Sequence, residues 1–275
     1  MTHDRSTLDE AGHAALRSCA EELAEIARAQ TLRWFRHPDL RAENKQASGF
    51  DPVTEADRAA EAAMRAHLAR LRPDDAILGE EMGKLGGESG LTWILDPIDG
   101  TRGFLAGTPC WSVLIALADR DGPFMGLIDQ PYIGERFLGG PGAAWCDGPQ
   151  GRRALGTRET SRLSEAVLST TFPEIGTKTE RAAFAQVADK VRLTRYGMDG
   201  YAYALLAAGQ IDLVIEAGLK PYDIAAPRAV IEAAGGVVTD WSGASVGDGG
   251  QVLAAANPLL HAEALAVLAE MRPRA

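Results

Sequence analysis

The sequence predicts a mixed α/β protein built from two closely joined halves. Residues 151–275 alternate between strand-like and helix-like patterns, which is typical of an α/β arrangement. Residues 1–150 begin with two helical patterns and continue with short apolar strands between Gly and Pro residues. Residues 139–162 are rich in Gly, Arg and small residues, so we expect loops there and a boundary between the halves near residue 150.

Helical periodicity and stop signals define the first half, for which we expect helices and a mainly antiparallel sheet. Apolar residues such as Leu16 and Leu23 recur at helical spacing and predict a helix over 7–35, with Thr7 and Glu10 as a capping box. The other expected elements are a polar loop with Lys45 that ends at Asp51-Pro52, a helix from Thr54 to about Leu71, and strands over 76–78, 93–95, 112–118, 124–129 and 135–138.

The second half alternates strands with helices. Pro227 lacks an amide donor and is tolerated only near the start of a helix, so Asp223 is expected close to that helix's N-terminus. The expected order is strand 166–171, helix 180–189, strand 191–196, helix 200–208, strand 211–216, helix 223–234, strands 236–240 and 252–255, and helix 258–271.

The composition excludes several classes of protein. With 46% hydrophobic residues, a chain of 275 residues can bury a sizeable core. No apolar run approaches a membrane span, and the N-terminus lacks the apolar core of a secretory signal, so we expect a cytoplasmic location and no membrane partner. A net charge of −10 argues against nucleic acid as a partner, and it requires bound cations if the substrate is an anion.

The segment WILDPIDGTRGF, residues 93–104, carries the strongest chemical signal. Asp96 and Asp99 flank a turn that Pro97 fixes, so both carboxylates can face one point. Hard divalent cations bind several oxygen ligands, backbone carbonyls included, so the Ile98 carbonyl is a further candidate. The alternative is a surface turn with Asp at its favoured positions.

Gly100 and Thr101 follow, where a helix can begin. Gly permits close backbone approach, and amides at a helix start point toward an anion, so this pair is a candidate phosphate site. Thr101 can also orient an attacking water, with Asp57 accepting its proton. The alternatives are an ordinary helix cap at Gly100 and, for Asp57, an acid that only complements the helix dipole.

Two more acids extend this set. Glu80 closes the strand of AILGEE, and Asp223 begins a later helix; taken alone, they are typical of a solvated turn and of a helix cap. If both converge with Asp96 and Asp99, each like-charged pair about 4 Å apart costs on the order of 4 kcal/mol at a surface-like dielectric constant. Convergence therefore predicts two or three Mg²⁺ ions, which would also bind a phosphate dianion.

Four blocks of the chain resemble the inositol monophosphatase superfamily of metal-dependent phosphatases. The resemblance covers nearly the whole chain and implies an inositol-monophosphatase-like αβαβα layered sandwich and a homodimer. The blocks are DPVTEAD at 51–57, GEE at 79–81, LDPIDGTRGF at 95–104 and YDIAAPRAVIEAAGG at 222–236.

The resemblance also implies a role for each residue. Glu80, Asp96 and the Ile98 carbonyl would hold a first metal, Asp96, Asp99 and Asp223 a second, and Glu80 would contribute to a third. Gly100 and Thr101 would contact phosphate. Thr101 and Asp57 would help to activate a metal-bound water for in-line attack.

Segments 128–140, 195–223 and 235–243 resemble the histidinol-phosphate phosphatase branch, which acts in histidine biosynthesis. L-Histidinol phosphate carries an amine and an imidazole, so its pocket needs acids, and Asp199 and Glu216 are the candidates. Alternatively, Asp199 caps a helix and Glu216 binds the hydroxyls of an inositol-type substrate. We also consider Asp129 as a residue that shapes the site.

The sequence thus predicts a Mg²⁺-dependent phosphomonoesterase that hydrolyses L-histidinol phosphate. The alternative enzyme is an inositol-1-phosphate phosphatase or a broad sugar-phosphate phosphatase, because the metal core reads only the phosphate. A remote alternative is a non-catalytic, phosphate-binding regulator, whose signature would be a broken metal core.

Overall fold

The structure is a computed structural model that describes residues 5, 8–44 and 52–270. Thr7, the loop positions Lys45 and Asp51, and Met271 lie outside these residues. The helices are α1 (Glu10–Trp34), α2 (Glu55–Leu71), α3 (Thr101–Leu105), α4 (Lys178–Ala188), α5 (Asp199–Ala207), α6 (Pro221–Ala233) and α7 (Pro258–Glu270). Within the described part of the chain, no helix is both long enough and apolar enough to cross a bilayer.

The strands form two main sheets and one small hairpin-like pair. The pair is β1 (Ala42–Asn44) with β2 (Pro52–Thr54). The first sheet holds β3 (Ala76–Gly79), β4 (Gly83–Leu85), β5 (Thr92–Asp99), β6 (Ser112–Asp119), β7 (Gly122–Gln130), β8 (Glu135–Gly140), β9 (Ala143–Asp147) and β10 (Arg153–Ala154). The second holds β11 (Val167–Thr170), β12 (Leu193–Tyr196), β13 (Leu213–Leu219), β14 (Val237–Thr239) and β15 (Gly250–Ala255).

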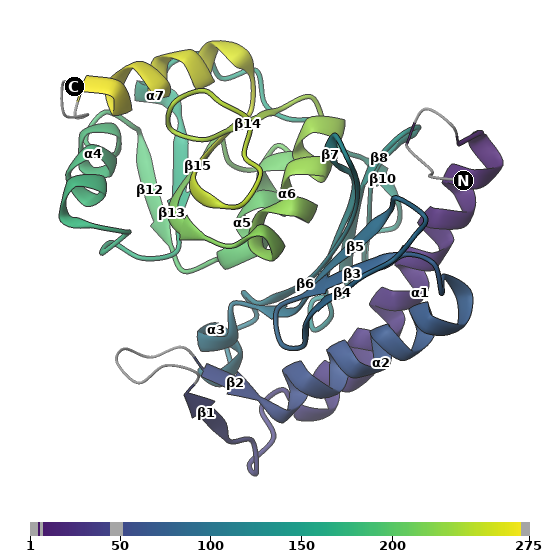
Figure 1. Ribbon diagram of the computed structural model, residues 1–275. Helices are drawn as coiled ribbons and strands as arrows, with labels where there is room; N and C mark the ends of the chain where they lie inside the picture. Colours follow the sequence, from purple (N-terminus) through teal and green to yellow (C-terminus); the bar gives the residue numbers. More distant parts are fainter. Residues whose placement is uncertain (1–4, 6–7, 45–51, 271–275) are drawn as a thin grey trace.

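These elements stack in five layers (Figure 1). Helices α1 and α2 cover one face of the first sheet, and α5 and α6 lie between the two sheets. Helices α4 and α7 cover the outer face of the second sheet. This αβαβα arrangement confirms the predicted fold class. Because α6 packs against strands of the first sheet, the two halves share an interior layer, and a division near residue 150 stays a prediction.

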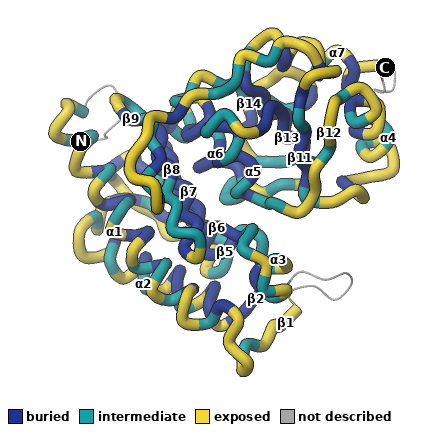
Figure 2. The backbone as a smooth tube through the Cα atoms, turned by 180° about the vertical axis from the view of Figure 1, so that it is seen from behind, coloured by how far each residue is buried: buried dark blue, intermediate teal, exposed yellow. Residues whose placement is uncertain are grey.

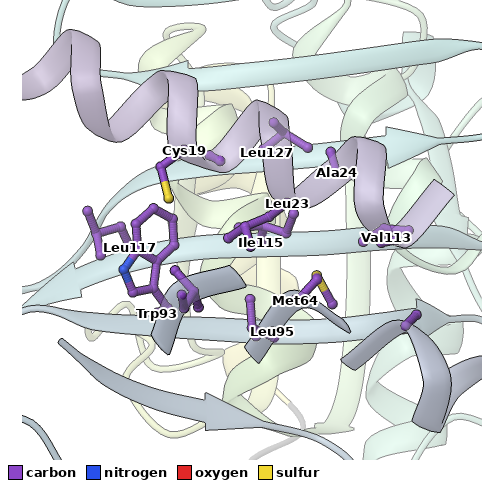
Figure 3. Packing of buried hydrophobic residues seen from close by; sticks show 14 of the residues in the cluster. Cys19, Leu23, Ala24, Met64, Trp93, Leu95, Val113, Ile115, Leu117 and Leu127 are labelled. Carbon is purple, nitrogen blue, oxygen red and sulfur yellow. The ribbon is translucent and has the colours of Figure 1, made fainter. Parts of the chain in front are cut away.

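The long α1 helix buries its apolar side against the first sheet. Leu16 and Leu23 are buried, as their helical spacing predicts. Figure 3 shows Leu23 beside Ile115 of the sheet and near Met64 of α2. The predicted start of this helix is wrong: it begins at Glu10, and the Asp9 carboxylate caps it by accepting a hydrogen bond from the Gly12 amide at 2.8 Å.

The predicted loop over 139–162 is wrong in part, because β8 extends into it and β9 and β10 lie within it, whereas residues 148–152 and 155–162 form no strand or helix. Gly142, with a φ of +67°, lies in the turn between β8 and β9, whereas Gly139 marks close packing. A Cβ at Gly139 would lie 2.5 Å from the Val230 Cα of α6, and a Cβ at Gly126 would lie 2.3 Å from the Ala226 carbonyl oxygen. Glycine lets α6 approach the sheet closely.

Burial follows the layers. The central strands are buried, whereas the outer turns of α1, α2, α4 and α7 are exposed (Figure 2). In the second sheet, β11 lies parallel to β12 and β13, and β15 runs antiparallel to β13 and β14. The predicted alternation of strands and helices is confirmed, with boundaries that shift by a few residues.

Pro227 lies farther into its helix than we expected. Asp223 is the third residue of α6, which confirms that it lies near the N-terminus, but Pro227 follows one turn later, inside the helix. A proline at this position removes the amide that would bond the Asp223 carbonyl.

Candidate active site

A β-bulge directs Asp96 and Asp99 toward the same site. In the β5–β6 pairing, Asp96 is opposite Leu114 and Asp99 is opposite Ser112, so β5 carries one extra residue between them. The Ile98 amide donates to Asp96 Oδ1 at 3.0 Å, which fixes the turn. Carboxylate oxygens of Asp96, Asp99 and Asp223 all lie within 4.8 Å of one another.

Asp223 reaches this cluster from α6, in the other half of the chain. Its Oδ2 accepts a hydrogen bond from the Lys220 amide at 2.7 Å, so the carboxylate also caps the helix. The two predicted roles of Asp223, helix cap and metal ligand, are therefore compatible in this position.

Glu80 lies at the end of β3, beside the bulge. Its amide donates to the Leu95 carbonyl at 3.1 Å, and its carboxylate acts electrostatically on Asp96, Asp99 and Asp223. The turn that follows is held by Glu61 of α2, which is fully buried and accepts hydrogen bonds from the Glu81 amide at 2.7 Å and the Met82 amide at 3.0 Å.

Glu61 was missed by sequence reasoning, although a signal existed. It lies on the buried side of α2 together with Ala60 and Met64, where an acid needs a partner. Arg65, one turn later, supplies part of that partnership through an ion pair at 2.7 Å.

The acid cluster has the electrostatic signature of a cation site. Burial, then the charges of Glu80, Asp99 and Asp223, raise the pKa of Asp96 well above its usual value. Burial, then Asp199 and Asp223, raise the pKa of Asp99. Burial raises the pKa of Asp223 to about 7. Acids whose charges oppose one another in this way are stabilised by bound cations.

The donor set fits a hard divalent cation. It consists of carboxylate oxygens from Glu80, Asp96, Asp99 and Asp223, and the Ile98 carbonyl lies in the same turn. Oxygen ligands of this kind suit Mg²⁺, whereas a zinc site would offer Cys or His. The ligand roles of the individual residues stay predictions.

Asp57 and Thr101 face each other at the edge of the cluster. Asp57 is buried, and its Oδ2 accepts hydrogen bonds from the Thr54 amide at 2.9 Å and the Thr54 hydroxyl at 2.5 Å. Its Oδ1 lies 3.5 Å from the Thr101 hydroxyl, which also lies 3.1 Å from the Ile98 carbonyl. Burial raises the pKa of Asp57 to about 6.

A pocket of about 470 Å³ opens beside the cluster. Its walls include most of the site residues predicted from the sequence: Glu80, Asp99, Gly100, Thr101, Asp199, Glu216 and Asp223. Asp57, Asp96 and Ile98 are buried behind this wall. The pocket walls also include Arg102, Phe172, Tyr203, Lys220 and Tyr222, to which sequence reasoning gave no role. Four of them lie in segments that carry the family resemblance, but neither spacing nor residue type marks them as site residues; no motif contains Phe172.

Gly100 and Gly200 allow two acids to approach. Gly100 has a φ of +85°, and a Cβ there would lie 3.0 Å from the Asp199 Cγ. The Gly200 amide donates a hydrogen bond to Asp99 Oδ2, and a Cβ on Gly200 would lie 2.5 Å from that oxygen. Asp199 itself has a φ of 43°, a strained value typical of functional sites.

Glu216 lies on β13 of the second sheet and lines the pocket. Its Oε1 accepts hydrogen bonds from the Thr171 amide at 2.6 Å and the Thr171 hydroxyl at 2.9 Å. Burial raises its pKa to about 7. For Asp199, burial raises the pKa to about 6, while the charge of Arg102 opposes that shift.

Asp129 does not line the pocket. Its buried carboxylate pairs with Arg28 at 2.6 Å and with Arg136 at 2.9 Å, between α1 and the first sheet. The expectation that Asp129 shapes the site is therefore wrong. A buried acid in a strand needed a charged partner, and two arginines supply it.

Comparisons with known proteins show the family to which this chain is similar. A model of the Inositol monophosphatase family matches residues 13–272. The histidinol-phosphatase of Mycobacterium tuberculosis is 36% identical over 272 residues, covering 96% of this chain and 98% of that protein. The bifunctional phosphatase IMPL2, chloroplastic, of Arabidopsis thaliana is 43% identical over 233 residues, covering 78% of this chain but 65% of that protein.

A solved structure is also similar. That structure, of an inositol monophosphatase from Zymomonas mobilis, is 36% identical in sequence and superposes with a TM-score of 0.83. The match covers 95% of this chain and 100% of that one.

Proposed function

The chain belongs to the inositol monophosphatase family and is a phosphatase of that family, and we propose that it hydrolyses L-histidinol phosphate with Mg²⁺ as its cofactor. One observation carries the choice of substrate. Two acids that the metal cluster does not require, Asp199 and Glu216, line the same pocket as that cluster.

The charges in the pocket suit a substrate that is anionic at one end and basic at the other. The phosphate group belongs at the end with Asp96, Asp99 and Asp223, where cations reverse the local charge. The amine and imidazole of L-histidinol would interact with Asp199, which borders Gly100, and with Glu216 on β13. Thr171 orients the Glu216 carboxylate through two hydrogen bonds, so this side chain is already held in position before the substrate binds.

Bound divalent cations supply positive charge that stabilises the phosphoryl group and favours ionisation of water. The protein contributes a proton acceptor and the residues that hold it in position. Asp57 is held on one side by Thr54, and its other oxygen faces the Thr101 hydroxyl. With a pKa of about 6, Asp57 is ionised at neutral pH and can accept a proton through Thr101.

A second candidate is an inositol-1-phosphate phosphatase. The similarity to the inositol monophosphatase of Zymomonas mobilis favours it, and the acid at position 216 would also suit the hydroxyls of a polyol. The metal cluster does not discriminate between the two, because it contacts only the phosphate end of either substrate.

Phosphate release from L-histidinol phosphate and myo-inositol 1-phosphate, measured side by side with Mg²⁺, tests the proposal. We expect kcat/KM to favour L-histidinol phosphate by a hundredfold or more, which corresponds to about 2.7 kcal/mol in the transition state. Equal rates, or a preference for the inositol ester, would assign the protein to the second function.

The proposal includes a homodimer, which the family resemblance implies. Light scattering of the purified protein checks it directly. A monomeric mass at the concentration of the assay would remove the dimer from the account and leave the chemistry unchanged.

A further inference from the structure

Tyr203 combines deep burial with an unsatisfied hydroxyl group. It lies on α5, it lines the active-site pocket, and it is only 3% exposed. Among the residues that the structure describes, none forms a hydrogen bond with its hydroxyl. Buried hydroxyls in proteins nearly always have a partner, and leaving one unpaired is destabilising, so this one needs an explanation.

Tyr203 shares the pocket wall with Glu216 and with the cluster acids Asp99 and Asp223. Of the charged groups around it, Glu216 has the largest effect, ahead of Asp99 and Asp223. Burial and these acids raise the pKa of the phenol well above its usual value. Tyr203 therefore keeps its proton and is available as a hydrogen-bond donor beside an acid.

Glu216 supplies the complementary acceptor. Both hydrogen bonds from Thr171 reach Oε1 of Glu216, the Thr170 hydroxyl also interacts with this carboxylate, and Glu216 lines the pocket. A phenol that donates and a carboxylate oxygen that accepts form a pair. A neutral imidazole presents the matching pair, one N–H and one bare ring nitrogen.

We propose that Tyr203 is a specificity-determining residue whose hydroxyl donates a hydrogen bond to one ring nitrogen of the substrate's imidazole, while Glu216 accepts from the other. This assignment rests on the proposed function and describes how the pocket recognises the organic half of the substrate. It also accounts for a buried hydroxyl that the protein itself leaves unpaired.

Tyr201 provides a matched control on the same helix. It is partly buried, and its hydroxyl donates to Glu135 Oε2 at 2.6 Å, away from the pocket. Tyr201→Phe and Tyr203→Phe each remove one oxygen atom from α5. The first loses a satisfied hydrogen bond, whereas the second loses a hydroxyl that is unpaired in the free protein.

The test measures the Mg²⁺-loaded enzyme with each half of the substrate separately. For Tyr203→Phe we expect KM for L-histidinol phosphate and the inhibition constant of L-histidinol to rise about tenfold. The inhibition constant of inorganic phosphate should stay unchanged, and Tm should stay the same or rise. For Tyr201→Phe we expect a lower Tm and unchanged kinetics.

Two results would overturn the assignment. An inhibition constant for L-histidinol that Tyr203→Phe leaves unchanged would exclude the contact with the imidazole. An equal loss of affinity for inorganic phosphate would show a general disturbance of the site. If the wild-type enzyme prefers myo-inositol 1-phosphate, the proposed function fails and the imidazole assignment fails with it; the first two results leave the proposed function intact.

Discussion

Asp57 Oδ1 lies 3.5 Å from the Thr101 hydroxyl, although the two residues are 44 positions apart in the chain. The other oxygen of Asp57 is held by Thr54, which belongs to the capping box of α2. A helix cap therefore fixes the direction of a candidate general base. The helix-dipole interpretation of Asp57 and the catalytic interpretation are compatible in this geometry.

Removal of the Thr101 hydroxyl tests this arrangement. Thr101→Ala should lower kcat by roughly 10² to 10⁴, the usual contribution of general base catalysis, because Asp57 loses its link to the attacking water. The Mg²⁺ concentration for half-maximal activity should change little. Thr101→Ser keeps the hydroxyl and should restore most of the turnover. A Thr101→Ala enzyme with normal kcat would contradict the role.

Asp96→Asn tests the metal cluster. The variant removes one of four neighbouring carboxylates, so we expect no measurable turnover and no rise in Tm on addition of Mg²⁺. In EDTA its Tm should equal or exceed that of the wild type, because repulsion among buried acids is relieved.

Asp147→Asn is the control for this experiment. Asp147 pairs with the exposed Arg152 at 3.0 Å and lies outside the active-site pocket, so its loss should alter neither turnover nor the Mg²⁺ response. Near-normal activity in Asp96→Asn would refute the cluster as a metal site.

Glu61→Gln tests a positioning residue that has no place in the pocket wall. Glu61 accepts the amides of Glu81 and Met82, and an amide nitrogen in its place would face donors with a donor. Because Glu80 precedes this turn, we expect the Mg²⁺ concentration for half-maximal activity to rise about tenfold to a hundredfold, as is usual when the supporting partners of metal ligands are removed.

Glu10→Gln is the control for Glu61→Gln. Glu10 is an exposed acid of α1 that pairs with Arg17, so its replacement should leave the Mg²⁺ concentration for half-maximal activity unchanged. If Glu61→Gln lowers Tm but keeps the normal Mg²⁺ response, Glu61 is structural only.

Contiguous motifs made much of this site predictable. Asp96, Asp99 and Gly100 lie in one segment whose spacing reflects a single bulge and turn. The position of Asp223 was predictable because Pro227, four residues later, indicates that a helix begins close to Asp223. Residues that act across the fold were not predictable. Tyr203 has the ordinary spacing of a core residue on its helix, and only the tertiary structure shows it in the pocket wall together with Glu216.

Composition misled the prediction where glycine had two possible meanings. Gly139 and Gly140 read as loop residues, yet they end β8, where Gly139 packs against Val230 of α6 and Gly140 against Met125 of β7. A glycine in a sequence can indicate a turn or a place where another element packs closely, and the sequence alone does not show which of the two applies. The same limit applies to Asp129, whose two arginine partners come from α1 and β8.

Glu216 predicts a pH dependence of stability. Its pKa is about 7 in the folded protein against an ordinary 4.5, so the folded state binds more protons between these pH values. Stability from this group therefore decreases as pH rises from 4.5 to 7, by up to about 1.4 kcal/mol per pH unit. Glu216→Gln removes the penalty, so relative to the wild type the variant should gain stability as pH increases.

Urea unfolding in EDTA at pH 5 and pH 7.5 checks this expectation. The difference in unfolding free energy between Glu216→Gln and the wild type should be larger at pH 7.5. Parallel stability curves for the two proteins would show that Glu216 has no raised pKa.

The ratio of kcat/KM for L-histidinol phosphate to that for myo-inositol 1-phosphate, compared between the wild type and Glu216→Gln, tests the central claim most directly. The account predicts a wild-type ratio of a hundred or more that falls at least tenfold in the variant, because Glu216 contacts the imidazole and not the phosphate. A ratio near one in the wild type, or a high ratio that Glu216→Gln leaves unchanged, would contradict the claim that this end of the pocket selects histidinol phosphate.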